Sequence, residues 1–196
     1  MLMEEPVFDT LRTQEQLGYT VFNTLRNTHG VLGFSITVNT QATKYTAEHV
    51  DERIENFLDQ FVLNHLHEEK VLYAANSLAK LKVRADVTLE EEVSRNWNEI
   101  VSKEYLFNRY EKEVVSLAEI KVEDVVEYFK PMLSTSTSCR KLSVHILGYK
   151  DGVDEKEDKE EKVFNLNLLK NNKHSIKDIQ EFKSKLEKHP VLYITE

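Results

Sequence analysis

The sequence predicts an α+β domain with two layers, an antiparallel sheet packed against several helices. Residues 20–26 and 31–38 are rich in β-branched and aromatic side chains, and the turn-forming run 27–30 between them predicts a β-hairpin. From residue 47 onward, apolar residues recur instead at helical spacing. Residues 142–146 return to strict alternation, which predicts a third strand. Three strands make a thin sheet for so many helices, so we expect the domain to lack its first strand or strands.

Two of the helical segments have marked beginnings. Thr88 with Glu91, and later Ser116 with Glu119, have the spacing of a capping box. In this motif a hydroxyl and a carboxylate satisfy backbone N–H groups at the start of a helix. Pro131 helps to end the helix that the second box opens. We expect Trp97, which has apolar neighbours at helical spacing, to pack in the core. The apolar residues that recur at helical spacing are Val50, Ile54, Phe57, Leu58, Phe61, Val62, Val71, Leu72, Ala75, Leu78, Leu81, Leu89, Val93, Trp97, Ile100, Val101, Val122, Val125, Val126 and Phe129.

The charge distribution suggests where the domain ends. We expect one α+β domain over residues 1–150, an acidic loop at 151–162 and a C-terminal helical extension over 163–196. The loop holds seven acids and three lysines, a composition that cannot bury an apolar face. Residues 175–188 predict a final helix. Residues 1–5 look helical without a capping residue before them, so we expect an N-terminally truncated chain cut from something longer.

The composition limits the kinds of function. The 196 residues are 40% hydrophobic and 31% charged, which is ordinary for a globular domain. A net charge of −8 without a basic stripe argues against nucleic acid as a partner. No apolar run approaches the roughly 18–20 residues of a membrane span, so no membrane partner is expected. Cys139 is the single cysteine, so an internal disulfide is excluded and a reducing, cytoplasmic location is expected.

Metal binding and nucleophilic catalysis find little support in the sequence. The run from His65 to Glu69 lacks both His-Glu-x-x-His and its inverted form. On a helix, His65 and His67 would also point about 200° apart. Cys139 lies in the polar run 134–139 without an obvious base, and the five glycines form no phosphate-binding loop. We therefore expect no metal site in this chain. The other histidines are scattered singly: His29, His49, His145, His174 and His189.

Arg12 and Tyr19 are the residues best suited to chemistry. Thr13 and Gln16 could cap a new helix, with Gly18 as the left-handed residue after it. Alternatively, a helix from the N-terminus continues through Arg12 and ends at Gly18; in either case both side chains could face one cavity. Arginine offers planar donors to carbonyl groups, and a tyrosine hydroxyl can donate to a developing negative charge. From these residues alone, a surface arginine and a sheet-packing tyrosine are the simpler interpretation.

The sequence around Arg12 and Tyr19 favours a functional role for them over the simpler interpretation. Residues 10–19 resemble a stretch in the C-terminal half of the inverted-zinc metallopeptidases, the insulin-degrading enzyme and nardilysin group. Residues 142–148 are similar to the last strand of the same domain, and the resemblance runs from about residue 5 to residue 149. Three further segments resemble the nardilysin members more closely: 26–38, 40–45 and 95–99.

The resemblance implies a specific division of labour. Members of this family close two halves around a peptide, and the N-terminal half binds Zn²⁺ through its inverted motif and supplies a glutamate base. The C-terminal half contributes an arginine that holds the substrate and a tyrosine that assists at the oxyanion, which correspond by position to Arg12 and Tyr19. Gln16 and Leu17 would set the end of the helix.

We therefore expect the substrate-holding C-terminal domain of a nardilysin-like zinc metalloendopeptidase. Its partners would be a peptide substrate and the zinc-binding N-terminal half. Because that half and its Zn²⁺ are absent from this chain, the chain alone is expected to be inactive. The alternative is a non-catalytic module, derived from this family, that binds peptides or proteins.

Overall fold

The computed structural model describes residues 1–28, 30–41, 44–146 and 176–187. The strands are β1 (Thr20–Thr28) and β2 (Val31–Asn39). The helical elements are α1 (Glu4–Val7), η1 (Phe8–Gln14), α2 (Ala47–His65), α3 (Glu68–Val83), α4 (Leu89–Ser102), α5 (Arg109–Glu119), α6 (Val122–Phe129), η2 (Lys130–Met132) and α7 (Ile179–Lys185). The predicted α+β class is confirmed. None of the described helices is long and apolar enough to cross a membrane.

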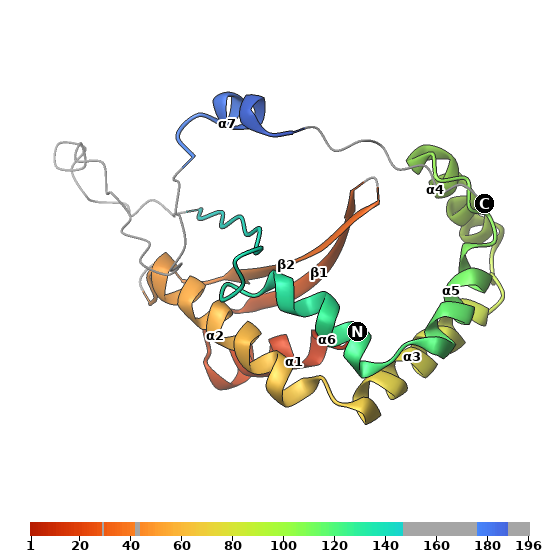
Figure 1. Ribbon diagram of the computed structural model, residues 1–196, viewed down its shortest axis with the longest axis horizontal. Helices are drawn as coiled ribbons and strands as arrows, with labels where there is room; N and C mark the ends of the chain where they lie inside the picture. The colour runs from red at the N-terminus through yellow and green to blue at the C-terminus, as the bar shows by residue number, and fades with distance from the viewer. Residues whose placement is uncertain (29, 42–43, 147–175, 188–196) are drawn as a thin grey trace.

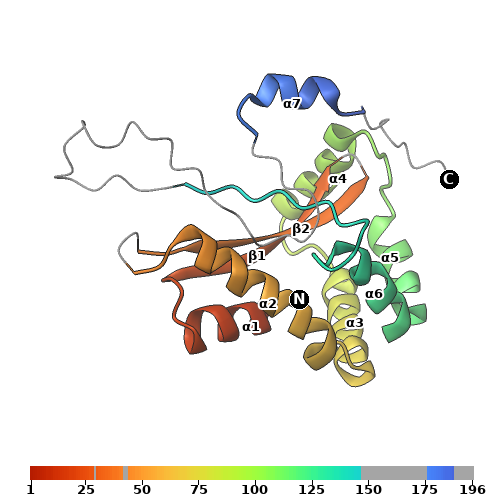
Figure 2. The same cartoon turned by 60° about the vertical axis from the view of Figure 1, so that its left-hand side comes forward.

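The hairpin and the helices packed on it form the centre of the molecule. Strands β1 and β2 pair antiparallel in one unbroken register, from Thr20 opposite Asn39 to Thr28 opposite Val31. The turn is closed at Gly30, which has a positive φ of 84° and whose N–H donates to the Asn27 side chain at 3.1 Å. Figures 1 and 2 show α1, α2 and α6 close to the hairpin, and Figure 1 shows α3, α5 and α4 as an arc to one side of it. The hairpin prediction is confirmed.

The core lies where the hairpin meets the first helices and α6. The ring of Phe34 on β2 stacks on Phe129 of α6 with centroids 5.4 Å apart, and Phe129 lies 5.5 Å from Phe61 of α2. Leu11 and Leu17, on either side of the η1 helix end, are almost completely buried. Burial of such side chains stabilises a fold by about 1.5–3 kcal/mol each, so the segment that carries Arg12 is firmly fixed.

The N-terminal helix passes without a break from α1 into η1, which is a π-helix. The Glu15 N–H donates to the carbonyl of Thr10, five residues back, at 2.9 Å. Gln16 then adopts a left-handed conformation with φ 52° and ends the helix. Of the two arrangements that the sequence allowed, the continuing helix is correct. Thr13 does not cap a new helix, because it lies inside η1.

Gly18 follows this junction, but it has no positive φ and so is not the left-handed residue that its position suggested. Its requirement is steric. A Cβ atom at Gly18 would lie 2.1 Å from the carbonyl oxygen of Asn39, where contacts under 3.0 Å essentially never occur. Glycine therefore lets the chain entering β1 pass directly against the end of β2.

The two predicted capping boxes had different outcomes. Thr88 caps α4 as expected, since its hydroxyl accepts from the Glu91 N–H at 3.2 Å. The prediction for Ser116 and Glu119 is wrong, because both residues lie inside α5. The Ser116 hydroxyl donates instead to the carbonyl of Lys112 within that helix. The next helix, α6, begins three residues after Glu119.

The predicted third strand is also wrong. Residues 142–146 pair with no strand in the described part of the chain, and Ile146 is 93% exposed. Polar contacts hold the start of this segment against α2 instead. Lys141 pairs with Asp51 at 2.9 Å and with Glu55, and the Ser143 hydroxyl donates to Asp51. Alternation therefore marked an extended segment, but a strand also needs a neighbouring edge to pair with.

Trp97 does not pack in the core, and that prediction is wrong as well. It is 60% exposed on α4, because the described sheet does not extend to cover the apolar face of that helix. At the other end, α7 spans Ile179–Lys185 and is shorter than predicted, with the Asp178 carboxylate accepting from the Gln180 N–H at 2.7 Å. The acidic loop at 151–162 lies outside the described residues, as do His29, His174 and His189. The domain boundaries stay a prediction.

Candidate substrate-binding site

Arg12 and Tyr19 are brought together by the junction between η1 and β1. The Arg12 Nε donates to the backbone carbonyl of Tyr19 at 2.8 Å. The guanidinium also lies over two aromatic rings, 4.6 Å from the centroid of Phe8 and 5.2 Å from that of Tyr19. Such cation–π contacts contribute about 0.5–1 kcal/mol each at exposed sites. Together they fix the orientation of the guanidinium relative to the start of β1.

The groups suited to a ligand are left free by this arrangement. Within the described residues, neither terminal nitrogen of Arg12 has a hydrogen-bond partner, and neither does the Tyr19 hydroxyl. Tyr19 is 85% exposed, so it does not pack on the sheet as the simpler interpretation supposed. The site therefore offers planar N–H donors and a phenolic O–H donor from adjacent side chains.

Helix α2 and the loop before it hold the junction in place. Arg53 of α2 makes a two-pronged ion pair with Glu15, with N–O distances of 2.7 and 2.6 Å. The hydrogen bond that Arg53 donates to Glu15 raises the pKa of Arg53, although burial opposes this, so Arg53 stays charged. Tyr45 donates to the Glu15 carbonyl at 3.3 Å, and Lys44 donates to the Gln16 carbonyl at 3.1 Å. These three residues were missed in the sequence because no local pattern links them to a junction about 30 residues earlier.

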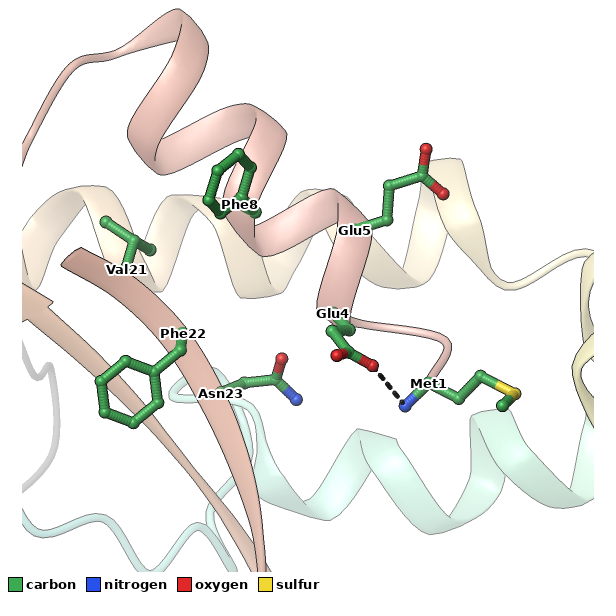
Figure 3. Close-up of a pocket in the computed structure, with 7 residues that line it drawn as sticks. All are labelled: Met1, Glu4, Glu5, Phe8, Val21, Phe22 and Asn23. Carbon is green, nitrogen blue, oxygen red and sulfur yellow. Dashed lines mark ion pairs between the residues drawn. The ribbon is translucent and has the colours of Figure 1, made fainter. Parts of the chain in front are cut away.

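A hollow of about 400 Å³ lies beside the site, between α1 and β1 (Figure 3). It reaches the site through Phe8, whose ring contacts both the hollow and the Arg12 guanidinium. The side-chain oxygen of Asn23 is buried here and accepts no hydrogen bond in the described part of the molecule. The lining residues are Met1, Glu4, Glu5, Phe8, Val21, Phe22 and Asn23.

The described residues do not fit a zinc ion. They contain no group of three histidine, cysteine, aspartate or glutamate side chains placed to hold a metal. The His65 ring stacks on Phe61 at 5.7 Å, and its Nδ1 lies 3.3 Å from Lys70 Nζ. Burial, and next the positive charge of Lys70, lowers the pKa of His65. Cys139 is equally unsuited to act as a nucleophile, because burial raises the pKa of its thiol.

Arg12 on η1 thus lies beside Tyr19, the residue before β1, within an α+β domain. Residues 1–97 match the family described as PQQ synthase PqqF-like, C-terminal lobe domain 4. The chain belongs to the inverted-zinc metallopeptidase family, as a C-terminal domain of the nardilysin-like type.

Particular relatives support this assignment. The chain is 46% identical to nardilysin of Homo sapiens over 166 residues, which cover 81% of this chain and 14% of that protein. It is 48% identical to nardilysin of Rattus norvegicus over 151 residues, 76% of this chain and 13% of that protein. Insulin-degrading enzyme of Drosophila melanogaster is 34% identical over 193 residues, 97% of this chain and 19% of that protein. The chain therefore spans less than a fifth of the length of these relatives.

Proposed function

We propose that this domain holds the peptide substrate of a nardilysin-like zinc metalloendopeptidase, through Arg12 and Tyr19. The observation that carries the proposal is the anchored guanidinium. Its Nε is engaged by the Tyr19 carbonyl, while its terminal nitrogens and the neighbouring hydroxyl have no partner among the described residues. An anchored donor loses little side-chain entropy when a ligand binds, so it is well suited to grip a carbonyl group.

Each residue has a distinct role in this proposal. Arg12 donates to a backbone carbonyl of the substrate and sets its position relative to Tyr19. The Tyr19 hydroxyl donates to the oxyanion of the tetrahedral intermediate, where charge develops during attack on the peptide bond. The ion pair between Arg53 and Glu15 keeps Tyr19 in place without touching substrate. Zinc and the attacking water belong to the N-terminal half that the family resemblance implies, outside this chain.

Hydrolysis after reconstitution tests the proposal. The chain is combined with the zinc-binding half of a nardilysin relative, and cleavage of a fluorogenic peptide is measured for Tyr19→Phe. Loss of an oxyanion donor lowers kcat by about 100-fold or more. Tyr73→Phe is the matched control, because Tyr73 is also strongly exposed but lies on α3, away from the site. An unchanged kcat for Tyr19→Phe would remove the proposed role.

The same experiment separates the alternative, a non-catalytic module that binds peptides or proteins. Both functions would use Arg12 to hold a peptide. A binding module would lose peptide affinity in Arg12→Ala, yet it would give no hydrolysis when it is combined with a zinc-binding half.

A further inference from the structure

The segment after α6 is linked to the first half of α2 through one lysine. Lys141 Nζ donates to Asp51 at 2.9 Å and to Glu55, and the Ser143 hydroxyl donates to the same Asp51 oxygen at 3.1 Å. Asp51 and Glu55 lie four residues apart on α2, so they share one face of that helix. Figure 1 shows this segment, in teal, returning from α6 toward the first turns of α2.

The two carboxylates of this cluster depend on Lys141 for charge compensation. Asp51 is only 8% exposed and Glu55 only 7%, and a buried carboxylate is costly unless it is paired. Among the described residues, Lys141 is the one cation that forms an ion pair with either of them. Burial disfavours the charged lysine, yet its hydrogen bonds to Glu55 and Asp51 outweigh burial and raise the pKa of Lys141. Without the lysine, two neighbouring buried carboxylates would repel each other.

The same turn of α2 supports the candidate site from its other face. Arg53 lies two residues from each of the two carboxylates, about 200° around the helix. Its guanidinium pairs with Glu15, which belongs to the junction between η1 and β1. Residues 51–55 are therefore held on one face by Lys141 and on the other face by the junction that carries the site.

We infer that Lys141 is a positioning residue for the proposed substrate-binding site. By binding Asp51 and Glu55 it fixes the first half of α2, and the ion pair of Arg53 with Glu15 extends this restraint to the junction. The inference rests on the proposed function and adds to it a residue that acts through α2. Loss of the lysine should let the first turns of α2 move toward water and loosen the hydrogen bond from Arg12 to the Tyr19 carbonyl.

NMR of the Arg12 side chain tests this positioning in the full chain. The Arg12 Nε–H, which donates to the Tyr19 carbonyl, gives a proton–nitrogen correlation signal that is assigned by its absence from Arg12→Lys. In Lys141→Met this N–H should exchange with water roughly tenfold faster, a factor that corresponds to the loss of about one hydrogen bond. Lys141→Arg keeps the cation and should retain most of the protection from exchange.

Lys82→Met is the matched control. Lys82 pairs with Glu113 between α3 and α5, and its side chain is 21% exposed, against 20% for Lys141. Both substitutions therefore remove a lysine–carboxylate contact of similar exposure, but Lys82 lies on α3, away from the site. Lys82→Met should leave the exchange of the Arg12 N–H unchanged.

A triple variant decides the question even if Lys141→Met does not fold. Asp51→Asn, Glu55→Gln and Lys141→Met together remove all three charges, which usually costs far less stability than removing one partner of a buried ion pair. Circular dichroism should show this variant to be folded, yet its Arg12 N–H should still exchange faster, because the ionic link to α2 is gone. Recovery of the original exchange rate would assign the effect to unpaired carboxylates and overturn the inference.

Peptide binding separates this inference from the proposed function. The probe is a short fluorescein-labelled peptide of threonine, valine and glutamine, and binding to the full chain is followed by fluorescence anisotropy. Faster Arg12 exchange in Lys141→Met, with weaker peptide binding by both Lys141→Met and Arg12→Ala, supports the inference. If Arg12→Ala weakens binding but Lys141→Met changes neither exchange nor affinity, the inference is overturned and the proposed function stands.

Two other outcomes also overturn the inference. Equal acceleration of exchange in Lys141→Met and Lys82→Met would show a general loss of stability in place of a restraint on the site. Unchanged affinity in Arg12→Ala would overturn the proposed function, and with it any role of Lys141 in substrate binding. Faster exchange in Lys141→Met would then assign to Lys141 a structural role at the junction alone.

Discussion

Gly18→Ala is the substitution that most directly tests how the site is built. The added Cβ would lie 2.1 Å from the Asn39 carbonyl oxygen and 2.7 Å from its carbonyl carbon, both backbone atoms. To reach even 3.0 Å from the oxygen, the two chain segments must separate by 0.9 Å. Such a shift falls where Thr20 pairs with Asn39, the first pair of the β1–β2 ladder. Overpacking of this kind costs about 1–3 kcal/mol, and we expect the upper end because no flexible side chain can yield.

Gly33→Ala provides the control for the same change on the same sheet. A Cβ at Gly33 would meet nothing within 4 Å, and the residue has no positive φ. This variant should be neutral or more stable by up to about 1 kcal/mol, because alanine restricts the unfolded chain.

Urea unfolding followed by circular dichroism measures both free energies, and peptide anisotropy reports the site. Gly18→Ala should lose stability and bind peptide more weakly, because Tyr19 follows the displaced residue. Equal stability of the two variants would refute the close approach of Gly18 to Asn39. It would also refute the role of this contact in positioning Tyr19.

Two further expectations concern stability away from the site. Hydrogen bonds from Arg109 lower the pKa of Glu99 from its ordinary 4.5, although burial opposes them. A lowered folded-state pKa contributes stability above about pH 4.5 that is lost as the pH falls through the folded value, so Glu99→Gln should flatten this part of a urea-unfolding pH series. Trp97→Ala should lower the free energy of unfolding by at most about 1 kcal/mol, because Trp97 is exposed. Phe129→Ala in the core should lower it by about 3–5 kcal/mol. A similar loss of stability for both variants would contradict the exposure of Trp97 on α4.

Local patterns predicted the elements of this fold better than their contacts. The hairpin follows from turn chemistry within a few residues, and α2 from periodicity within one helix, so both are readable from the sequence. The periodicity around Trp97 identified an apolar helix face but not what covers it. Alternation in residues 142–146 likewise identified an extended segment but not its pairing partner. Burial and pairing depend on distant parts of the chain, and a local pattern does not contain them.

The candidate site likewise combines features that local sequence predicts with contacts that it does not. Arg12 and Tyr19 were singled out through a family resemblance, whereas from the residues alone an ordinary surface pair was the simpler interpretation. The ion pair of Arg53 with Glu15 joins residues 38 positions apart, which no motif or spacing marks. The local sequence allowed two helix arrangements, a new helix capped by Thr13 or a helix continuing from the N-terminus. The structure has the continuing helix, as the π-helix η1.

The π-helix explains why one short segment can form most of the proposed peptide-binding site. It closes its hydrogen bonds one residue later than an α-helix does, so side chains after the change point in a different direction. Regular α-helical geometry through η1 would change the direction of the Arg12 side chain relative to the Tyr19 carbonyl that it now contacts. Since π-helical turns are less favourable than α-helical ones, this geometry needs external support. Arg53, Tyr45 and Lys44 provide that support from α2 and the loop before it, so the local segment supplies the donors and the rest of the domain holds them in position.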